Sequence, residues 1–188
     1  MFITAFLFLI QTLFDLFIYI VLLRFLLQTL HIDHFNPLSQ FTLKFTQWIV
    51  KPLQKIIPEV KGIDLAIIVL LLCLEMLKIM VLVAIQFSAW PNFFGLLLLS
   101  IAGLLGKLLT FYFYAILIRV ILSWVTPTHP NAIFFAFHQL TEPVLRPFRR
   151  LIPVIGGFDL SPLLALILTQ FLSLLIISPL TQFAMSFL

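Results

Sequence analysis

Four charged side chains interrupt apolar stretches of the sequence and are its strongest candidates for chemistry: Asp15, Glu75, Lys78 and Lys107. Each would cost about 2.5–3.5 kcal/mol if it stood alone inside a membrane. Two acids and two bases at a similar depth can neutralise one another, and Glu75 and Lys78, three residues apart, share a helix face. We therefore expect a Glu75–Lys78 pair beside an Asp15–Lys107 pair.

Three interpretations of this intramembrane polar cluster are open at the level of sequence. The pairs could be a structural clamp that fixes the register of neighbouring helices. They could also line a path for an ion or a proton, which in so small a protein would need an oligomer to enclose water. In the third interpretation the lysines lie nearer the surface and extend their ammonium groups to water.

No pattern in the sequence predicts catalysis. The metalloprotease, nucleophile-elbow and phosphate-loop patterns are absent, so we expect a protein that is not an enzyme, with no catalytic residue and no cofactor. His31 and His34, with Asp33 between them, have only loose metal-ligand spacing and no evident third ligand. We interpret them as a solvated pair at a membrane surface and predict no metal site.

The composition excludes a fold that is solvated by water. Of 188 residues 63% are hydrophobic and only 10% are charged, and the mean hydropathy is +1.22. Soluble domains average about 45–50% apolar and about 25% charged residues. The single cysteine, Cys73, cannot form an intrachain disulfide and gives no indication of an oxidising compartment.

The elements that must position the charged residues are membrane-spanning helices, which need roughly 20 residues each. Four stretches are long enough, and they predict an all-α integral membrane protein: about Phe2–Leu30, Leu65–Phe87, Asn92–Val125 and Ser161–Phe187. The first lacks the basic start and the short apolar core of a signal peptide, so we expect it to be retained. Ala102 and Gly106 in the third stretch favour close helix packing, inside the protein or between copies.

The basic residues predict how the chain is oriented. Seven of the eleven lie in the two long connections between spans, and the side that carries both chain ends has none. Because cytoplasmic loops carry the excess of Lys and Arg, we expect both long loops in the cytoplasm and both termini outside.

The chain also contains an internal repeat with an offset of 95 residues. Residues that match in this register include Tyr19 and Tyr114, Arg24 and Arg119, Thr46 and Thr141, Pro58 and Pro153, Gly62 and Gly157, and Asp64 and Asp159. We predict two parallel repeats, 1–91 and 92–188, each a helix, an interfacial hairpin (about 33–63 and 128–158) and a second helix. Such an arrangement differs from the inverted repeats of many transporters.

Each hairpin begins with a helix, expected over Leu38–Ile57 and over Asn131 to about Leu140. In Leu38–Ile57 apolar residues recur with helical spacing on one face and basic residues lie on the other, as in an amphipathic helix that lies in the membrane plane. The second helix is more apolar and could lie deeper in the membrane. We expect these basic residues to meet anionic headgroups or a partner, which could be another membrane protein or a second copy: Lys51, Lys55, Arg146, Arg149 and Arg150. No basic groove faces water, which disfavours nucleic acid.

Prolines in the hairpins are expected to break these helices and to redirect the chain into the bilayer. The structural motif assigned to this turn comprises Pro58, Gly62 and Asp64 in the first repeat and Pro153, Gly157 and Asp159 in the second. The glycines permit a sharp turn, and the aspartates are interpreted as caps of the next span rather than as catalytic acids.

The run from Glu142-Pro143 through Arg146-Pro147, Arg149-Arg150 and Ile152-Pro153 to Gly156-Gly157-Phe158-Asp159 resembles the signature of the YggT (or YlmG) family of small bacterial and plastid membrane proteins. The first repeat departs from it, with Gln54-Lys55 in place of the arginine pair. The resemblance implies the cytoplasmic (inner) membrane of a bacterium. It also implies a role in osmotic or ion homeostasis, in assembling membrane complexes, or near nucleoid and division machinery.

Three functions follow as expectations. The first is a non-enzymatic inner-membrane factor that assembles or positions complexes or supports osmotic and ion homeostasis. The second is a small oligomeric ion-handling protein that uses the buried charges. The third is a membrane tether for nucleoid or division machinery through the basic loops.

Overall fold

The computed structural model describes residues 2–60, 62–87, 91–124, 132–151 and 159–187. The sequence predictions for Pro153 and Gly157 lie outside these residues. The described chain is helical, with the following elements: α1 (Phe2–Thr29), α2 (Pro37–Gln54), α3 (Leu65–Phe87), α4 (Phe93–Trp124), α5 (Ala132–Leu151), α6 (Ser161–Leu172), a π-helical turn (Ser173–Ile177) and α7 (Ser178–Met185).

Four of these helical stretches are long and apolar enough to cross a membrane: Phe2–Thr29, Leu65–Gln86, Phe93–Ser123 and Ser161–Met185. This confirms the predicted all-α fold with four spans. The last span is not uniform, because a π-helical turn separates α6 from α7. Pro179 follows directly in the first turn of α7, and a proline that lacks its N–H is a common cause of such local rearrangement.

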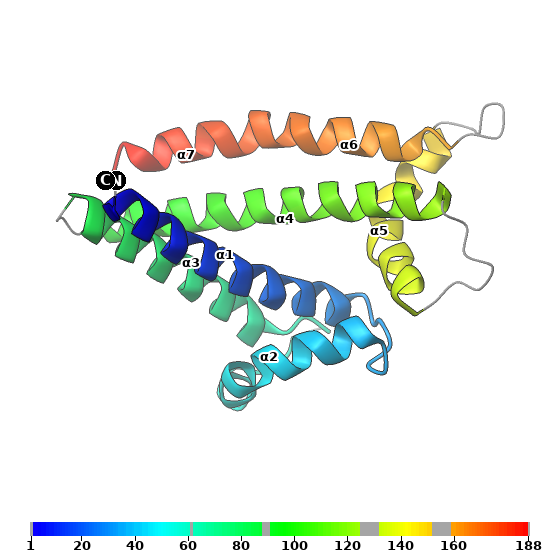
Figure 1. The fold of residues 1–188 in the computed structure, drawn as a ribbon, viewed down its shortest axis with the longest axis horizontal. Helices are drawn as coiled ribbons and strands as arrows, with labels where there is room; N and C mark the ends of the chain where they lie inside the picture. The colour runs from blue at the N-terminus through cyan, green and yellow to red at the C-terminus, as the bar shows by residue number, and fades with distance from the viewer. Residues whose placement is uncertain (1, 61, 88–90, 125–131, 152–158, 188) are drawn as a thin grey trace.

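The spans pack as a row in which α1 contacts α3, α3 contacts α4, and α4 contacts α6 and α7. In Figure 1 both chain ends lie at one end of this bundle, and α2 and α5 lie toward the other end. Contacts between α1 and α4 are few by comparison. The two halves of the molecule are therefore joined mainly through α3 and α4.

The start of α2 follows from local sequence. His31 adopts a left-handed conformation (φ 52°) after α1, and Ile32 N–H then donates to the Leu27 carbonyl at 2.9 Å, which closes the helix end. Asn36 caps α2 by accepting from Leu38 N–H at 3.0 Å, with Pro37 in the first turn. Asn36 also donates to the Ala132 carbonyl at 2.7 Å, so the starts of α2 and α5 meet.

The expectation that prolines break the interfacial helices is wrong for the described residues. Helix α2 continues through Pro52, and α5 continues through Pro143 and Pro147 to Leu151, beyond the predicted end near Leu140. Both prolines of α5 are exposed, so the carbonyls that they leave unpaired can meet water or headgroups.

Packing on either side of these prolines holds α5 together. Ala136 and Leu140 pack with the core that includes α1 and α3, whereas Leu145 packs with Ile116 and Ala165 of the second half. A helix fixed at both ends by buried side chains can tolerate two missing backbone hydrogen bonds. Helix α2, in contrast, ends at Gln54, slightly before the predicted Ile57.

Candidate functional site

The four charged residues predicted from the sequence form one cluster on three helices. Lys78 Nζ of α3 lies 2.9 Å from Asp15 Oδ1 of α1 and 2.5 Å from Glu75 Oε1 of α3. Lys107 Nζ of α4 lies 3.1 Å from Asp15 Oδ1 and 2.9 Å from Glu75 Oε1. Both pairs expected from the sequence are present, but they are not separate. Each lysine bridges both acids, so the charges alternate around a closed ring.

The charged side chains of this ring are largely buried, so their pairing strongly affects stability. The side chains of Glu75 and Lys78 are 2% and 8% exposed, and that of Lys107 is 12% exposed. Two carboxylates and two ammonium groups sum to zero, so the cluster spares each charge most of the cost of standing alone in hydrocarbon. Only Asp15, at 26%, is open to a neighbouring groove.

Two details place Glu75 at the centre of the cluster. A Cβ at Gly103 of α4 would lie 2.5 Å from Glu75 Oε1, so a larger residue there would have to displace the Glu75 carboxylate. Glu75 Oε2 is buried and has no hydrogen-bond partner among the described residues. One carboxylate oxygen thus accepts from both lysines while the other is unsatisfied.

The structure adds a pair of arginine clamps that the sequence analysis did not predict. Arg24 of α1 donates to Thr46 Oγ1 of α2 at 2.8 Å, and Arg119 of α4 donates to Thr141 Oγ1 of α5 at 2.9 Å. All four residues are buried. The signal was available in the sequence, because both the arginines and the threonines match at the 95-residue offset.

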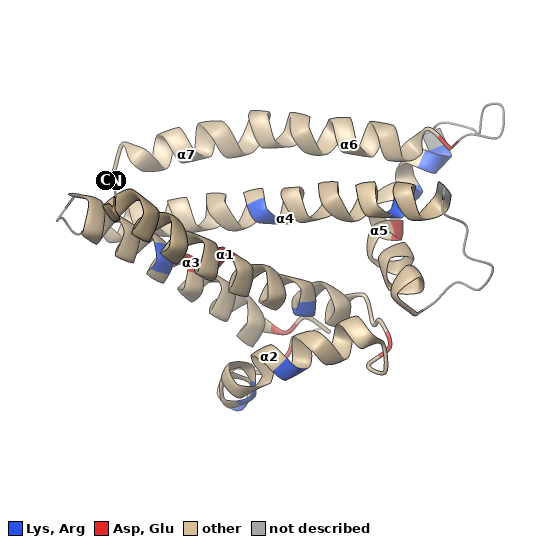
Figure 2. Cartoon of the chain, in the orientation of Figure 1, with Lys and Arg blue, Asp and Glu red and all other residues tan. Residues whose placement is uncertain are grey.

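The second clamp is extended by charges. Arg119 also pairs with Glu142 at 3.0 Å, and Arg149 bridges Glu142 at 3.1 Å and Asp159 at 3.0 Å. Asp159 in turn accepts hydrogen bonds from the N–H and the hydroxyl of Ser161 at the start of α6. The network therefore links α4, α5 and α6, and Figure 2 shows these charges gathered where the three helices meet.

This network shifts the acid–base equilibria of its members. Burial raises the pKa of Glu142, but the hydrogen bond from Arg119 and the charge of Arg149 outweigh it and leave the pKa below the ordinary value. Burial also raises the pKa of Asp159, but the hydrogen bonds from Ser161 and Arg149 outweigh this effect and leave the pKa below its ordinary value. The pKa of His138 is lowered by burial and by the adjacent Arg119 charge.

In the equivalent network of the first half, the side chains that donate to the aspartate are uncharged. Asp64 Oδ2 accepts from Gln54 at 2.5 Å and from Gln28 at 3.2 Å, and Asp64 Oδ1 accepts from Ile67 N–H at 3.3 Å, which caps α3. Gln54 matches Arg149 at the 95-residue offset. The contact to the aspartate thus comes from a neutral amide in one half and from a charged guanidinium in the other.

The predicted basic residues do not all have the same environment. Lys51, Lys55, Arg146 and Arg150 are exposed on or just after α2 and α5. Arg149 is exposed as well, but it also pairs with Glu142 and Asp159, so that its role toward lipid or a partner stays a prediction. An acid seven residues earlier in α5 and another ten residues later in the chain capture it.

The remaining motif residues have structural positions. Gly62 adopts φ +82° in the turn between Val60 and Ile63, a conformation that disfavours other residues. Pro58 is exposed before this turn.

A Cβ at Gly106 would lie 3.5 Å from Ile177, and Ala102 is buried, so the small-residue face of α4 packs inside the protein. Within the described part of the chain, no group of three His, Cys, Asp or Glu side chains could hold a metal.

The fold and these contacts define a helical protein with four candidate membrane spans and two shorter helices, α2 and α5, fixed at one end of its bundle. The sequence model described as CCB3/YggT matches it twice, over residues 3–85 and 98–180. The chain belongs to this family.

Relatives in several organisms are similar over most of the chain. An uncharacterized protein in the proC 3' region of Vibrio alginolyticus is 48% identical over 174 residues, 89% of this chain and 91% of that protein. The uncharacterized protein YggT of Escherichia coli K12 is 37% identical over 86% of this chain and 83% of its own length. The chloroplastic YlmG homolog protein 2 of Arabidopsis thaliana is 41% identical over 39% of this chain and 32% of its own. No solved structure matches.

Proposed function

We propose that this protein is a non-enzymatic factor of the cytoplasmic membrane that positions other membrane components, or supports osmotic and ion homeostasis, by presenting two interfacial helices from a rigid body. This proposal rests on the observation that a buried arginine–threonine contact fixes each of the two helices, α2 and α5, to a span. A loosely attached amphipathic helix would need no such contact.

We further propose that the chain is two parallel repeats, 1–91 and 92–188. The family match occurs once in each half. The Arg24–Thr46 and Arg119–Thr141 contacts join residues 22 positions apart in each half. The aspartates near the starts of α3 and α6 accept from residues at matching positions, Gln54 and Arg149.

The surface of α2 suits a membrane interface. Its buried face is small and mostly polar (Ser39, Thr42, Thr46 and Val50), whereas Phe41, Phe45 and Trp48 are 46–69% exposed. Exposed lysines lie on the same helix. Aromatic side chains beside basic ones match the boundary between acyl chains and anionic headgroups. With the basic loops in the cytoplasm, α2 and α5 would lie on the inner leaflet.

The test is neutralisation to Gln of four exposed basic residues that form no ion pair among the described residues: Lys51, Lys55, Arg146 and Arg150. Each basic residue near an anionic surface contributes about 1 kcal/mol. All chains carry Trp90→Phe and Trp124→Phe, so that Trp48 is the single donor. In vesicles with labelled phosphatidylglycerol, energy transfer from Trp48 should show enrichment of that lipid around the chain with its natural basic residues, and this enrichment should fall in the variant. Glu59→Gln, an exposed acid in the same connection, is the control. Equal enrichment in all three chains would reject the proposal.

A second candidate, an oligomeric ion-handling protein, is favoured by one observation. Glu75 Oε2 is buried and unsatisfied among the described residues, and Asp15 connects the same cluster to an open groove. The test is cation and proton flux into liposomes for the natural chain and for the double variant Glu75→Leu with Lys107→Leu. Because that variant retains the neutral Asp15–Lys78 pair, it should fold. Flux that is lost in the variant supports this candidate, and equal flux rejects it.

A further inference from the structure

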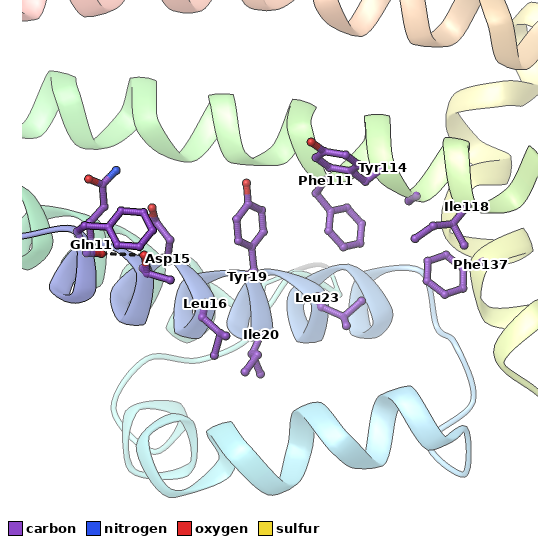
Figure 3. Close-up of a pocket in the computed structure, with 13 residues that line it drawn as sticks. Gln11, Asp15, Leu16, Tyr19, Ile20, Leu23, Phe111, Tyr114, Ile118 and Phe137 are labelled. Atoms are coloured by element: carbon purple, nitrogen blue, oxygen red, sulfur yellow. Dashed lines mark hydrogen bonds between the residues drawn. The ribbon is translucent and has the colours of Figure 1, made fainter. Parts of the chain in front are cut away.

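A groove of about 740 Å³ lies between α1 and α4, where the two halves of the molecule diverge. It extends along α1 from Phe8 to Leu23, roughly 22 Å at 1.5 Å per residue. Phe137 of α5 lines one end, as Figure 3 shows. Its volume lies within the range of small-molecule sites, about 300–1,000 Å³.

The walls of the groove come from matching positions of the two halves. Leu16 of α1 and Phe111 of α4 line the groove and are 95 residues apart. The same holds for Tyr19 of α1 and Tyr114 of α4. The groove therefore lies on the line that relates the two halves. Sites between repeats are where membrane proteins with duplicated folds place ligands near the middle of the bilayer.

Polar groups line this otherwise apolar groove. In Figure 3 Gln11 and Tyr19 point from α1 toward α4. The hydrogen bonds between described residues include none from the Gln11 amide or the Tyr114 hydroxyl, and Tyr114 is 57% exposed. A polar group left without a partner in hydrocarbon costs free energy. An ordinary acyl chain in the groove would leave both groups unsatisfied, so the occupant carries a polar group of its own.

The depth of these groups restricts the occupant further. Tyr114 faces the groove beside Tyr19, which lies ten residues before the end of α1, about 15 Å along the helix. A charged headgroup at that depth would lose its hydration, as any ion in the bilayer does. A neutral polar group is therefore favoured at this depth. Because the Gln11 amide and the Tyr114 hydroxyl can both donate, acceptor oxygens on that group would pair with both.

The aromatic walls point to the shape of that group. Phe8, Phe111 and Phe137 line the groove together with the two tyrosines. Aromatic side chains pack favourably against a planar ring in offset or edge-on geometry. We propose that the groove binds a neutral membrane-soluble lipid with a planar, carbonyl-bearing ring on a hydrocarbon tail, of the class of prenylated benzoquinones. The ring carbonyls would accept from Gln11 and Tyr114, and the tail would lie between α1 and α4.

The experiment uses a prenylated benzoquinone as the probe and tryptophan quenching as the readout. The three native tryptophans are replaced by phenylalanine, and Phe111→Trp places one reporter in the groove. A matched chain carries Phe171→Trp on α6, which is 55% exposed and outside the groove. In vesicles, quenching should saturate with quinone content at position 111 and rise only in proportion to it at position 171. Proportional quenching at both positions would overturn the proposal.

Two conservative variants test the polar contact. Tyr114→Phe removes only the hydroxyl and should weaken quinone binding about three- to tenfold. Tyr112→Phe, the same change on the same helix but within the core, should leave binding unchanged. Equal affinity for both variants would reject the assigned site.

The alternative occupant is a helix of a second copy. In a Cys73→Ser background, Ile118→Cys on the groove wall should give no disulfide-linked dimer. Efficient dimer formation there, together with no saturable quenching, would show that protein and not lipid fills the groove.

Discussion

At the scale of single residues, the cluster of Asp15, Glu75, Lys78 and Lys107 behaves as one unit rather than as two ion pairs. Both lysines contact the same Glu75 oxygen and the same Asp15 oxygen. Removing one acid therefore leaves two ammonium groups to share one carboxylate. Removing one acid and one base leaves a complete pair.

This arrangement predicts strong coupling between Glu75 and Lys107. Glu75→Gln alone should lower stability by about 3–5 kcal/mol, since an uncompensated charge stays buried. Glu75→Gln with Lys107→Met should be more stable than Glu75→Gln, because Asp15 and Lys78 then neutralise each other. Thermal unfolding of all variants in one detergent gives the comparison. If the losses simply add, the closed ring is wrong.

Gly103 provides a second prediction at this scale. Gly103→Ala should displace the Glu75 carboxylate, because the new methyl group would lie 2.5 Å from Oε1. Gly106→Ala, one turn away on the same helix, would meet Ile177 at an ordinary 3.5 Å and should be tolerated. The melting temperatures of the two proteins should differ by several degrees. Equal melting temperatures would mean that the cluster can move without loss.

At the scale of elements, the arginine clamps decide where α2 and α5 lie. Helix propensity and amphipathic spacing form these helices, but Arg24 and Arg119 attach them to spans through Thr46 and Thr141. Hydrogen bonds to charged donors contribute about 1.5–3 kcal/mol each. The two clamps are alike in geometry, but in the described part of the chain the arginine of the second also forms an ion pair, with Glu142.

Removing one threonine hydroxyl should loosen the helix that carries it and leave the other helix in place. Thr46→Val should increase hydrogen exchange in α2 and leave α5 protected, and Thr141→Val should do the reverse. Each replacement keeps the size of the side chain, so packing changes little. Exchange that rises equally in both helices after either change would argue against independent clamps.

Acidification should loosen α5 before α2. The pKa values of Glu142 and Asp159 are lowered in the folded protein, so their contribution is complete above the ordinary carboxyl pKa values, 4.5 and 3.8. It is lost as the pH falls through the lowered values. Hydrogen exchange in α5 should therefore rise as vesicles are taken from pH 7 to below pH 4.

The first half contains the control for this pH effect, since Gln47 stands where the second half has Glu142. Helix α2 should respond less over the same range. Glu142→Gln should reduce the response of α5. An α5 that is as protected at pH 3 as at pH 7 would show that the ion pairs contribute little to its attachment.

At the scale of the whole molecule, one end of the bundle carries α2 and α5 and the other carries both chain ends (Figure 1). The exposed basic residues lie at the first of these ends. This separation is what the positive-inside rule uses to orient a protein. We propose that it places α2 and α5 on one leaflet.

Cysteine labelling tests that orientation. In a Cys73→Ser background, Lys55→Cys and Arg150→Cys should react with a membrane-impermeant thiol reagent from the cytoplasmic side. Phe2→Cys, 93% exposed at the start of α1, should react from the opposite side. Positions 55 and 150 labelled from opposite sides would refute both the orientation and the proposed parallel repeats.

Composition and residue spacing were enough to predict the number of spans, the class of fold and the residues of the polar cluster. Those properties depend on composition and on residue spacing along one helix, and an isolated charge in lipid is costly wherever the chain folds. The 95-residue offset also matched Arg24 with Arg119 and Thr46 with Thr141. It did not predict that each arginine would contact the threonine of its own half.

How these residues combine depends on the way the helices pack, which the sequence did not predict. Both lysines reach both acids because α3 lies between α1 and α4, which no spacing within one helix could show. Helix α5 continues through Pro143 and Pro147 because buried contacts on both sides hold it, whereas local rules predict a break. The groove exists because α1 and α4 diverge. Each of these outcomes depends on contacts between distant segments, and packing overrides local preference where such contacts are made.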